Sequence, residues 1–269
     1  MKQLLRFDER GIRKSTGDFS AANFNDFSDN VIQGIEYLKN RKETKNSIIG
    51  LIGHSKGGST AMIASDRSKL IKFMVLLGAI SVPIEENIYQ EIRLEERAKN
   101  TSETFIEATI QAYSYIFKVL KSEKNNSIVN KRMELFYENQ FLNTSGHVKQ
   151  NWEIIKKNIF TFIEDLCTPW SRSSIKFDPG KILSRTKIPV LAIWGSKDMI
   201  IPSNVNLIPM KTALESAKNK NFSLIVIDSV NHEMQTSRTG FPDEYQIIEE
   251  TVSPKLLDQI KKWIHQISL

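Results

Sequence analysis

A short glycine-rich segment contains the residue best suited to nucleophilic chemistry. Ser55 is the central residue of the pentapeptide 53–57, GHSKG, which follows the apolar run 48–52 and precedes several small residues. A G-x-S-x-G pattern between a strand and a helix predicts a tight turn that exposes the serine hydroxyl. The glycines at 53 and 57 are expected because a Cβ at either position would collide with the adjoining strand or helix. The alternative is a glycine-rich helix start that a serine caps.

A serine hydroxyl becomes a good nucleophile only when a base removes its proton. The chain has four histidines. His54 lies inside the turn itself, His147 lies in a helical stretch, and His265 lies in the last helical turn. His232 follows the predicted strand 223–227, in a loop expected at the carboxyl edge of a sheet. It is therefore the candidate base, and the alternative is an ordinary loop histidine.

The base requires an acid that orients its ring and stabilises the imidazolium. Asp198 is the first candidate because it follows a predicted strand and gives the chain order Ser, Asp, His that is expected on this type of sheet. Asp228 is too close in sequence to His232 to be preferred. Glu85 or Glu86 is a second possible acid, and otherwise these two are charges at a helix N-terminus.

Short apolar runs that favour strands alternate with helical patterns along most of the chain. This alternation predicts an α/β fold with an open, mostly parallel sheet of about five strands, whose chemistry lies at the carboxyl ends of the strands. The runs are residues 4–7, 48–52, 73–77, 190–194 and 223–227.

The strand signal disappears in the middle of the chain. Between residues 85 and 176 only helical periodicity remains, with apolar residues spaced by three or four. We therefore expect two domains, an α/β core formed by residues 1–84 and 177–269 and an all-helical insertion over residues 85–176.

The composition of the 269 residues excludes several classes. The 37 basic residues exceed the 31 acidic ones, but they are scattered, so nucleic-acid binding is not expected. The longest apolar stretch, residues 73–84, is too short to span a bilayer, so no membrane association is expected. The single cysteine, Cys167, excludes an intramolecular disulfide. No export signal is visible at the start, so the expected location is the cytoplasm.

Four segments together resemble the α/β-hydrolase superfamily, and more closely its bacterial serine esterases of the acyl-ester hydrolase type with a helical cap. The resemblance continues from residue 177 to residue 263 and is weakest in the insertion. The four segments are residues 6–17, 52–58, 190–202 and 230–232.

The resemblance implies a role for each candidate residue. Ser55 would be the nucleophile, His232 the general base and Asp198 the residue that orients it, while the backbone N–H of Lys56 would form half of the oxyanion hole. The implied activity is hydrolysis of a small or medium-chain carboxylic ester through an acyl-enzyme, with no metal or organic cofactor. Thioester and peptide bonds remain open as substrates, and the partner is a small-molecule ester.

The chain also departs from the relatives at its N-terminus, at Lys56 and at Arg13, where the family commonly has Gly. They carry three strands and a helix ahead of the segment that corresponds to residues 4–7, so we expect a truncated N-terminus and a missing second oxyanion donor. Either strand 4–7 closes against strand 48–52, or the latter becomes an exposed edge through which a homo-oligomer could form.

The alternative function is a catalytically impaired hydrolase that lacks half of the oxyanion hole. Lys56 replaces the usual Glu, Gln or Met, and its cation would favour anionic substrates.

Overall fold

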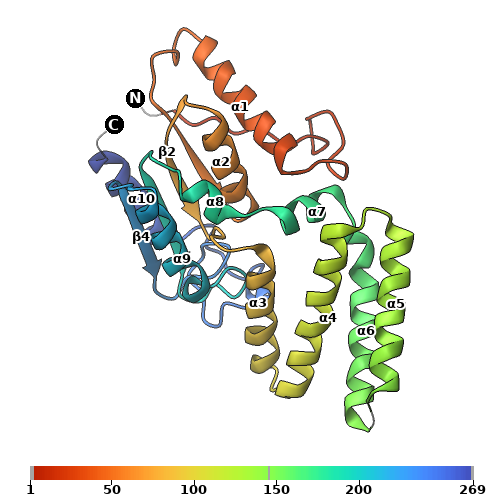
Figure 1. Ribbon diagram of the computed structural model, residues 1–269. Helices are drawn as coiled ribbons and strands as arrows, with labels where there is room; N and C mark the ends of the chain where they lie inside the picture. The colour runs from red at the N-terminus through yellow and green to blue at the C-terminus, as the bar shows by residue number, and fades with distance from the viewer. Residues whose placement is uncertain (1–2, 145, 268–269) are drawn as a thin grey trace. The chain divides into compact units, whose positions relative to one another are not determined.

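The computed structural model describes residues 3–144 and 146–267, and Figure 1 shows the course of the chain. The chain divides into two compact units. The first consists of Met1–Pro83 together with Asp178–Leu269, and the second is Ile84–Phe177. The use of the second unit as a cap stays a prediction.

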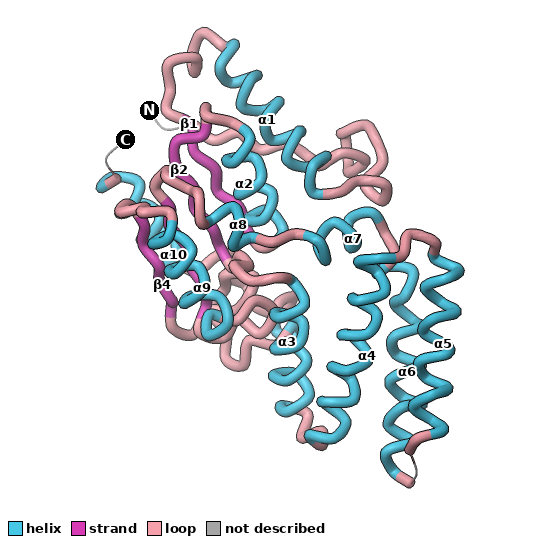
Figure 2. The backbone as a smooth tube through the Cα atoms, in the orientation of Figure 1, coloured by secondary structure: helices cyan, strands magenta, loops and turns pink. Residues whose placement is uncertain are grey.

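The first unit contains a four-stranded, entirely parallel sheet (Figure 2). The spatial order β1-β2-β3-β4 is also the chain order, so β1 and β4 form opposite edges. The predicted α/β fold with a parallel sheet is confirmed. The strands are β1 (Ile49–His54), β2 (Ile71–Leu77), β3 (Val190–Gly195) and β4 (Phe222–Ile227).

The prediction of a strand at residues 4–7, and with it a count of five, is wrong. This segment has no regular secondary structure, and the side chain of Leu4 is 73% exposed. Leu5 and Phe7 instead lie beside helix α1 (Phe24–Asn40), with side-chain atoms 3.6 and 3.1 Å from the position that a Cβ on Gly34 would take. Strand propensity at residues 4–7 is not enough, because a strand also requires a neighbour that accepts its hydrogen bonds.

Strand β1 is consequently an edge of the sheet, the second of the two expected outcomes. Among the residues that the structure describes, β2 is the only strand that pairs with β1. The side chain of Ile52 is 51% exposed, although it lies in the middle of an apolar strand. Association of a second copy along this edge stays a prediction.

Helices cover both faces of the central strands. Alternate residues of β3 point to opposite faces, and Leu191 and Ile193 join Leu256 and Trp263 of α10 in one buried cluster. Trp194 points to the other face and is also fully buried. The helices of this unit are α1 (Phe24–Asn40), α2 (Lys56–Arg67), α8 (Pro179–Leu183), the 3-10 turn η1 (Pro242–Glu244), α9 (Ser203–Ser216) and α10 (Pro254–Gln266).

The second unit has a separate hydrophobic core. Phe117, Met133, Tyr137, Trp152 and Ile155 are each at most 2% exposed and belong to one cluster. Within the described ranges of both units, no helix combines the length and the apolar character that crossing a membrane requires. The helices of this unit are α3 (Ile84–Ala98), α4 (Glu103–Ser122), α5 (Asn126–Leu142), α6 (His147–Leu166) and α7 (Pro169–Lys176).

Candidate active site

Ser55 occupies a strained turn between β1 and α2. Its φ of 53° and ψ of −119° lie in a region that residues with a side chain rarely adopt. The backbone N–H of Ser55 donates to the carbonyl of Leu77 at the end of β2 (2.8 Å), and its carbonyl accepts from Gly58 (2.9 Å). Such strain costs about 1–3 kcal/mol and persists only where the surroundings impose it. Here β2 and the first turn of α2 impose it.

The glycines around Ser55 are not equally necessary. A Cβ on Gly53 would lie 2.3 Å from the carbonyl oxygen of Gly57, so the expected collision is confirmed there. A Cβ on Gly57 would meet nothing within 4 Å, so the prediction for this residue is wrong. The close approach is at Gly58, whose added Cβ would lie 2.6 Å from that of Ala79. The tight packing therefore falls one residue later than the motif suggests.

The structure brings the three predicted side chains together. Nε2 of His232 lies 3.0 Å from Oγ of Ser55, and Nδ1 lies 3.0 Å from both carboxylate oxygens of Asp198. His232 is 6% exposed and Asp198 is 3% exposed. Because an ionised carboxylate only accepts hydrogen bonds, this arrangement favours a proton on Nδ1 and leaves Nε2 to accept from the Ser55 hydroxyl. The catalytic roles of these residues stay predictions.

Backbone groups hold the carboxylate of Asp198 in place. Its Oδ1 accepts from the N–H groups of Ile200 (3.0 Å) and Ile201 (2.7 Å). On its other side is Gly78, which follows β2 with a φ of +50°. A Cβ on Gly78 would lie 3.2 Å from Oδ2 of Asp198 and 3.3 Å from Nδ1 of His232. The end of β2 therefore packs directly against the acid–base pair.

The loops that carry the acid and the base are fastened to each other. The N–H of Lys197 donates to the carbonyl of Val230 (2.9 Å). A Cβ added to Gly195 would lie 1.9 Å from the oxygen of the same carbonyl, so this position has no room for a side chain. Asn231 and Gln235 exchange backbone and side-chain hydrogen bonds and close the turn that contains the base. Sequence reasoning missed this turn, although an Asn and a Gln four residues apart around a candidate histidine are a usable signal.

The alternative acids have other partners. The carboxylate of Asp228 accepts from the hydroxyls of Ser229 (3.0 Å) and Ser196 (3.1 Å), and these hydrogen bonds, Ser229 first, lower its pKa. In the second unit, Glu85 forms an ion pair with Lys121 (2.6 Å). The carboxyl group at Nδ1 of His232 is that of Asp198.

The side chain of Lys56 contacts residues before α1 and in its first turn. Its ammonium lies 2.8 Å from Oε2 of Glu9 and 4.6 and 4.2 Å from the ring centroids of Phe19 and Phe27. A cation in this position is attracted both by the carboxylate and by the faces of the rings. Because this charge is already paired, the arrangement argues against the expected preference for anionic substrates.

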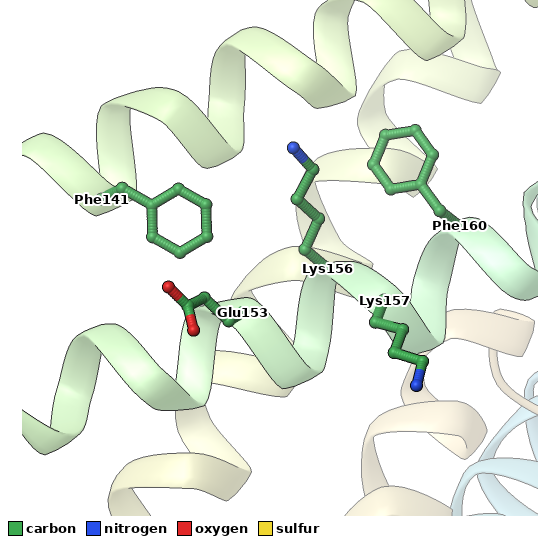
Figure 3. A pocket seen from close by; sticks show the side chains of 5 residues that line it. All are labelled: Phe141, Glu153, Lys156, Lys157 and Phe160. Carbon is green, nitrogen blue, oxygen red and sulfur yellow. The ribbon is translucent and has the colours of Figure 1, made fainter.

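A separate cavity of about 420 Å³ lies in the second unit (Figure 3). It contains none of the residues Ser55, Asp198 and His232. Across the described residues, no group of three or more His, Cys, Asp or Glu side chains is arranged to hold a metal ion. The cavity is lined by Phe141 of α5 and by Glu153, Lys156, Lys157 and Phe160 of α6.

Comparison with known proteins bears on the fold. The family model described as "BAAT / Acyl-CoA thioester hydrolase C terminal" matches residues 32–154, which is less than half of the chain but includes Ser55. No curated protein matches the chain in sequence.

Solved structures resemble the chain over nearly its whole length. An esterase from Pyrococcus furiosus is 14% identical over 94% of this chain and 66% of that chain, with a TM-score of 0.50. The peroxisomal α/β-hydrolase Lpx1 of Saccharomyces cerevisiae is 16% identical over 93% and 62%, with a TM-score of 0.46. The chain has the α/β-hydrolase fold.

A lipase-esterase related protein from Clostridium acetobutylicum is 17% identical over 94% of this chain and 80% of that one, with a TM-score of 0.46. Identities this low concern the fold alone. The α/β-hydrolase fold accounts for the meeting of Ser55, Asp198 and His232, because each follows a strand at the same edge of the sheet.

Proposed function

We propose that the chain is a serine hydrolase that cleaves a carboxylic ester of small or medium acyl chain through an acyl-enzyme. The observation that supports this proposal is the continuous hydrogen-bonded path from Oγ of Ser55 through the ring of His232 to Asp198. Strain at Ser55 adds support, because strained residues concentrate at functional sites.

In the proposed reaction, Oγ of Ser55 attacks the ester carbonyl carbon while its proton moves to Nε2 of His232. The carbonyl oxygen becomes an oxyanion, which the N–H of Lys56 and the N-terminus of α2 stabilise. The C–O bond then breaks, and the leaving alcohol takes the proton from His232. Water repeats the two steps on the acyl-enzyme, releasing the acid and restoring the Ser55 hydroxyl.

Asp198 supports this cycle through its carboxylate, which accepts a hydrogen bond from Nδ1 of His232. The N–H groups of Ile200 and Ile201 stabilise its negative charge, and that charge stabilises the imidazolium of His232 when the proton arrives. We expect Asp198→Asn to lower kcat by about 10³–10⁴-fold, because an amide can donate to Nδ1 and favour the wrong tautomer.

A second candidate substrate is an acyl-CoA thioester. The matched family model carries that activity in its description, and the match includes Ser55 and the turn around it. The same nucleophile and base serve both substrates, since each presents an acyl carbonyl. Parallel assays with p-nitrophenyl butyrate and butyryl-CoA, compared as kcat/KM, decide between ester and thioester.

A fluorophosphonate probe tests the proposal directly. We expect the purified protein to gain one probe mass on the peptide that contains Ser55, and Ser55→Ala to gain none. Both proteins should melt at similar temperatures, because the change removes only a hydroxyl.

A monodisperse, folded protein that neither reacts with the probe nor hydrolyses either substrate would support the impaired-hydrolase alternative. One assigned oxyanion donor, the N–H of Lys56, also sets an expectation for the rate. Loss of one such donor typically lowers turnover by about 10²–10³-fold, so labelling should be easier to detect than turnover.

A further inference from the structure

We infer that His54 is a positioning residue, whose ring fixes the backbone of His232 at the correct distance from Ser55. The inference rests on the proposed function, because it assigns His54 a part in presenting the base to the nucleophile. The G-x-S-x-G motif does not specify a role for His54, because any residue can occupy the position before the serine.

The contact is short and its direction is unambiguous. Nε2 of His54 lies 2.7 Å from the backbone carbonyl oxygen of His232. A carbonyl oxygen only accepts, so the His54 ring must carry a hydrogen on Nε2. The ring centroids are 5.1 Å apart and the ring planes meet at 41°, so the two imidazoles are not stacked. The hydrogen bond therefore defines both the protonated nitrogen and the orientation of the His54 ring.

The bond joins opposite edges of the sheet. Ser55 follows β1, His232 lies beyond β4, and two strands separate β1 from β4. Neighbouring strands are about 4.8 Å apart, so the two edges are about 14 Å apart. A small change in sheet twist would therefore shift the base relative to the nucleophile, unless a direct contact joins their loops.

Asp198 alone cannot supply that contact. Asp198 comes from the loop after β3, and its carboxylate binds Nδ1 of His232, which fixes the rotation of the ring. His54 is covalently adjacent to Ser55 and holds the backbone of the same histidine. Since β1 pairs with β2 alone among the described strands, this bond supplements the sheet in fixing the nucleophile against the base.

Two variants separate the hydrogen bond from simple packing. His54→Leu keeps much of the side-chain volume but has no donor, whereas His54→Gln keeps an N–H donor of similar reach. We expect His54→Leu to lower kcat for p-nitrophenyl butyrate about 10- to 100-fold with KM changed less than about threefold, because a 1 Å misplacement can cost about 10²-fold. We expect His54→Gln to restore kcat to within about threefold of the parent.

A second measurement does not depend on activity. In a ¹⁵N-labelled full-length chain, the imidazole nitrogens of His54, assigned by their loss in His54→Gln, should show protonated Nε2 and unprotonated Nδ1 at neutral pH. A proton on Nδ1 instead, or a kcat for His54→Leu equal to that of the parent, would overturn the inference.

The two proposals fail in different ways. If the parent protein does not react with the fluorophosphonate at Ser55, the proposed function is wrong, and the nitrogen shifts of His54 still decide whether the bond exists. If the parent reacts and His54→Leu reacts at the same rate, the function stands and the positioning role of His54 is refuted.

Discussion

Gly78 offers a sharp test of how the acid–base pair is packed. It follows β2 with a φ of +50°, and an added Cβ would lie 3.2 Å from Oδ2 of Asp198, 3.3 Å from Nδ1 of His232 and 3.0 Å from Cε of Met234. The substitution Gly78→Ala therefore places one methyl group against both members of the pair. Because two of these three neighbours belong to the candidate site, we expect an effect on reactivity as well as on stability.

The size of the effect follows from two contributions. A left-handed backbone at a residue with a Cβ costs roughly 1–2 kcal/mol, and overpacking a dense site costs about 1–3 kcal/mol. The free energy of unfolding should therefore fall by about 2–5 kcal/mol. The methyl group also forces His232 or Asp198 to move by a few tenths of an ångström, which stretches the 3.0 Å contact with Ser55. We expect labelling of Ser55 to slow by about 10- to 100-fold.

Urea unfolding and the rate of fluorophosphonate labelling, measured below the unfolding transition, separate the two contributions. Gly180→Ala is the matched control in the same unit, because its Cβ meets only the carboxylate of Asp178, at 3.3 Å. This control should label at the parental rate. The reasoning is refuted if folded Gly78→Ala labels within twofold of the parent, since a methyl group in that position could not leave the pair undisturbed.

Three further outcomes are expected. Glu9→Gln should lower the free energy of unfolding by less than about 1 kcal/mol in urea titrations, because its partner Lys56 keeps both aromatic contacts and the pair is partly exposed. Asp66→Asn should lower the free energy of unfolding by a similar amount at neutral pH. Hydrogen bonds from Arg185 lower the pKa of the Asp66 carboxyl, so the stability difference from the parent should persist above about pH 4 and disappear as the pH falls through the lowered pKa. Calorimetry of both proteins at several pH values checks this dependence. Burial raises the pKa of the Cys167 thiol, so a thiol reagent at neutral pH should react at least about 10²-fold more slowly with the native protein than in urea, and equal rates would contradict this.

The candidate site could be predicted from sequence because its chemistry follows a positional rule. Ser55, Asp198 and His232 each come shortly after an apolar run, and parallel strands bring their carboxyl ends to one edge. The rule requires only that the runs be recognised as strands, and central runs such as residues 190–194 are recognisable because both of their faces are buried.

Other features depend on partners that no local pattern reveals. Residues 4–7 have the composition of a strand, but a strand forms only where another strand pairs with it. Gly58 must be glycine because an added Cβ would collide with Ala79, whereas a Cβ on Gly57 would meet no other atom within 4 Å. This difference depends on how α2 packs against Ala79, which the motif does not reveal. The role inferred for His54 depends on a carbonyl 178 positions away, which no spacing within the motif can indicate.

The three side chains of the candidate site all come from one unit. Met1–Pro83 and Asp178–Leu269 supply Ser55, Asp198 and His232, whereas Ile84–Phe177 enters the chain between β2 and β3 and has its own hydrophobic core. Evolution can therefore lengthen, shorten or replace the insertion without rebuilding the reactive centre.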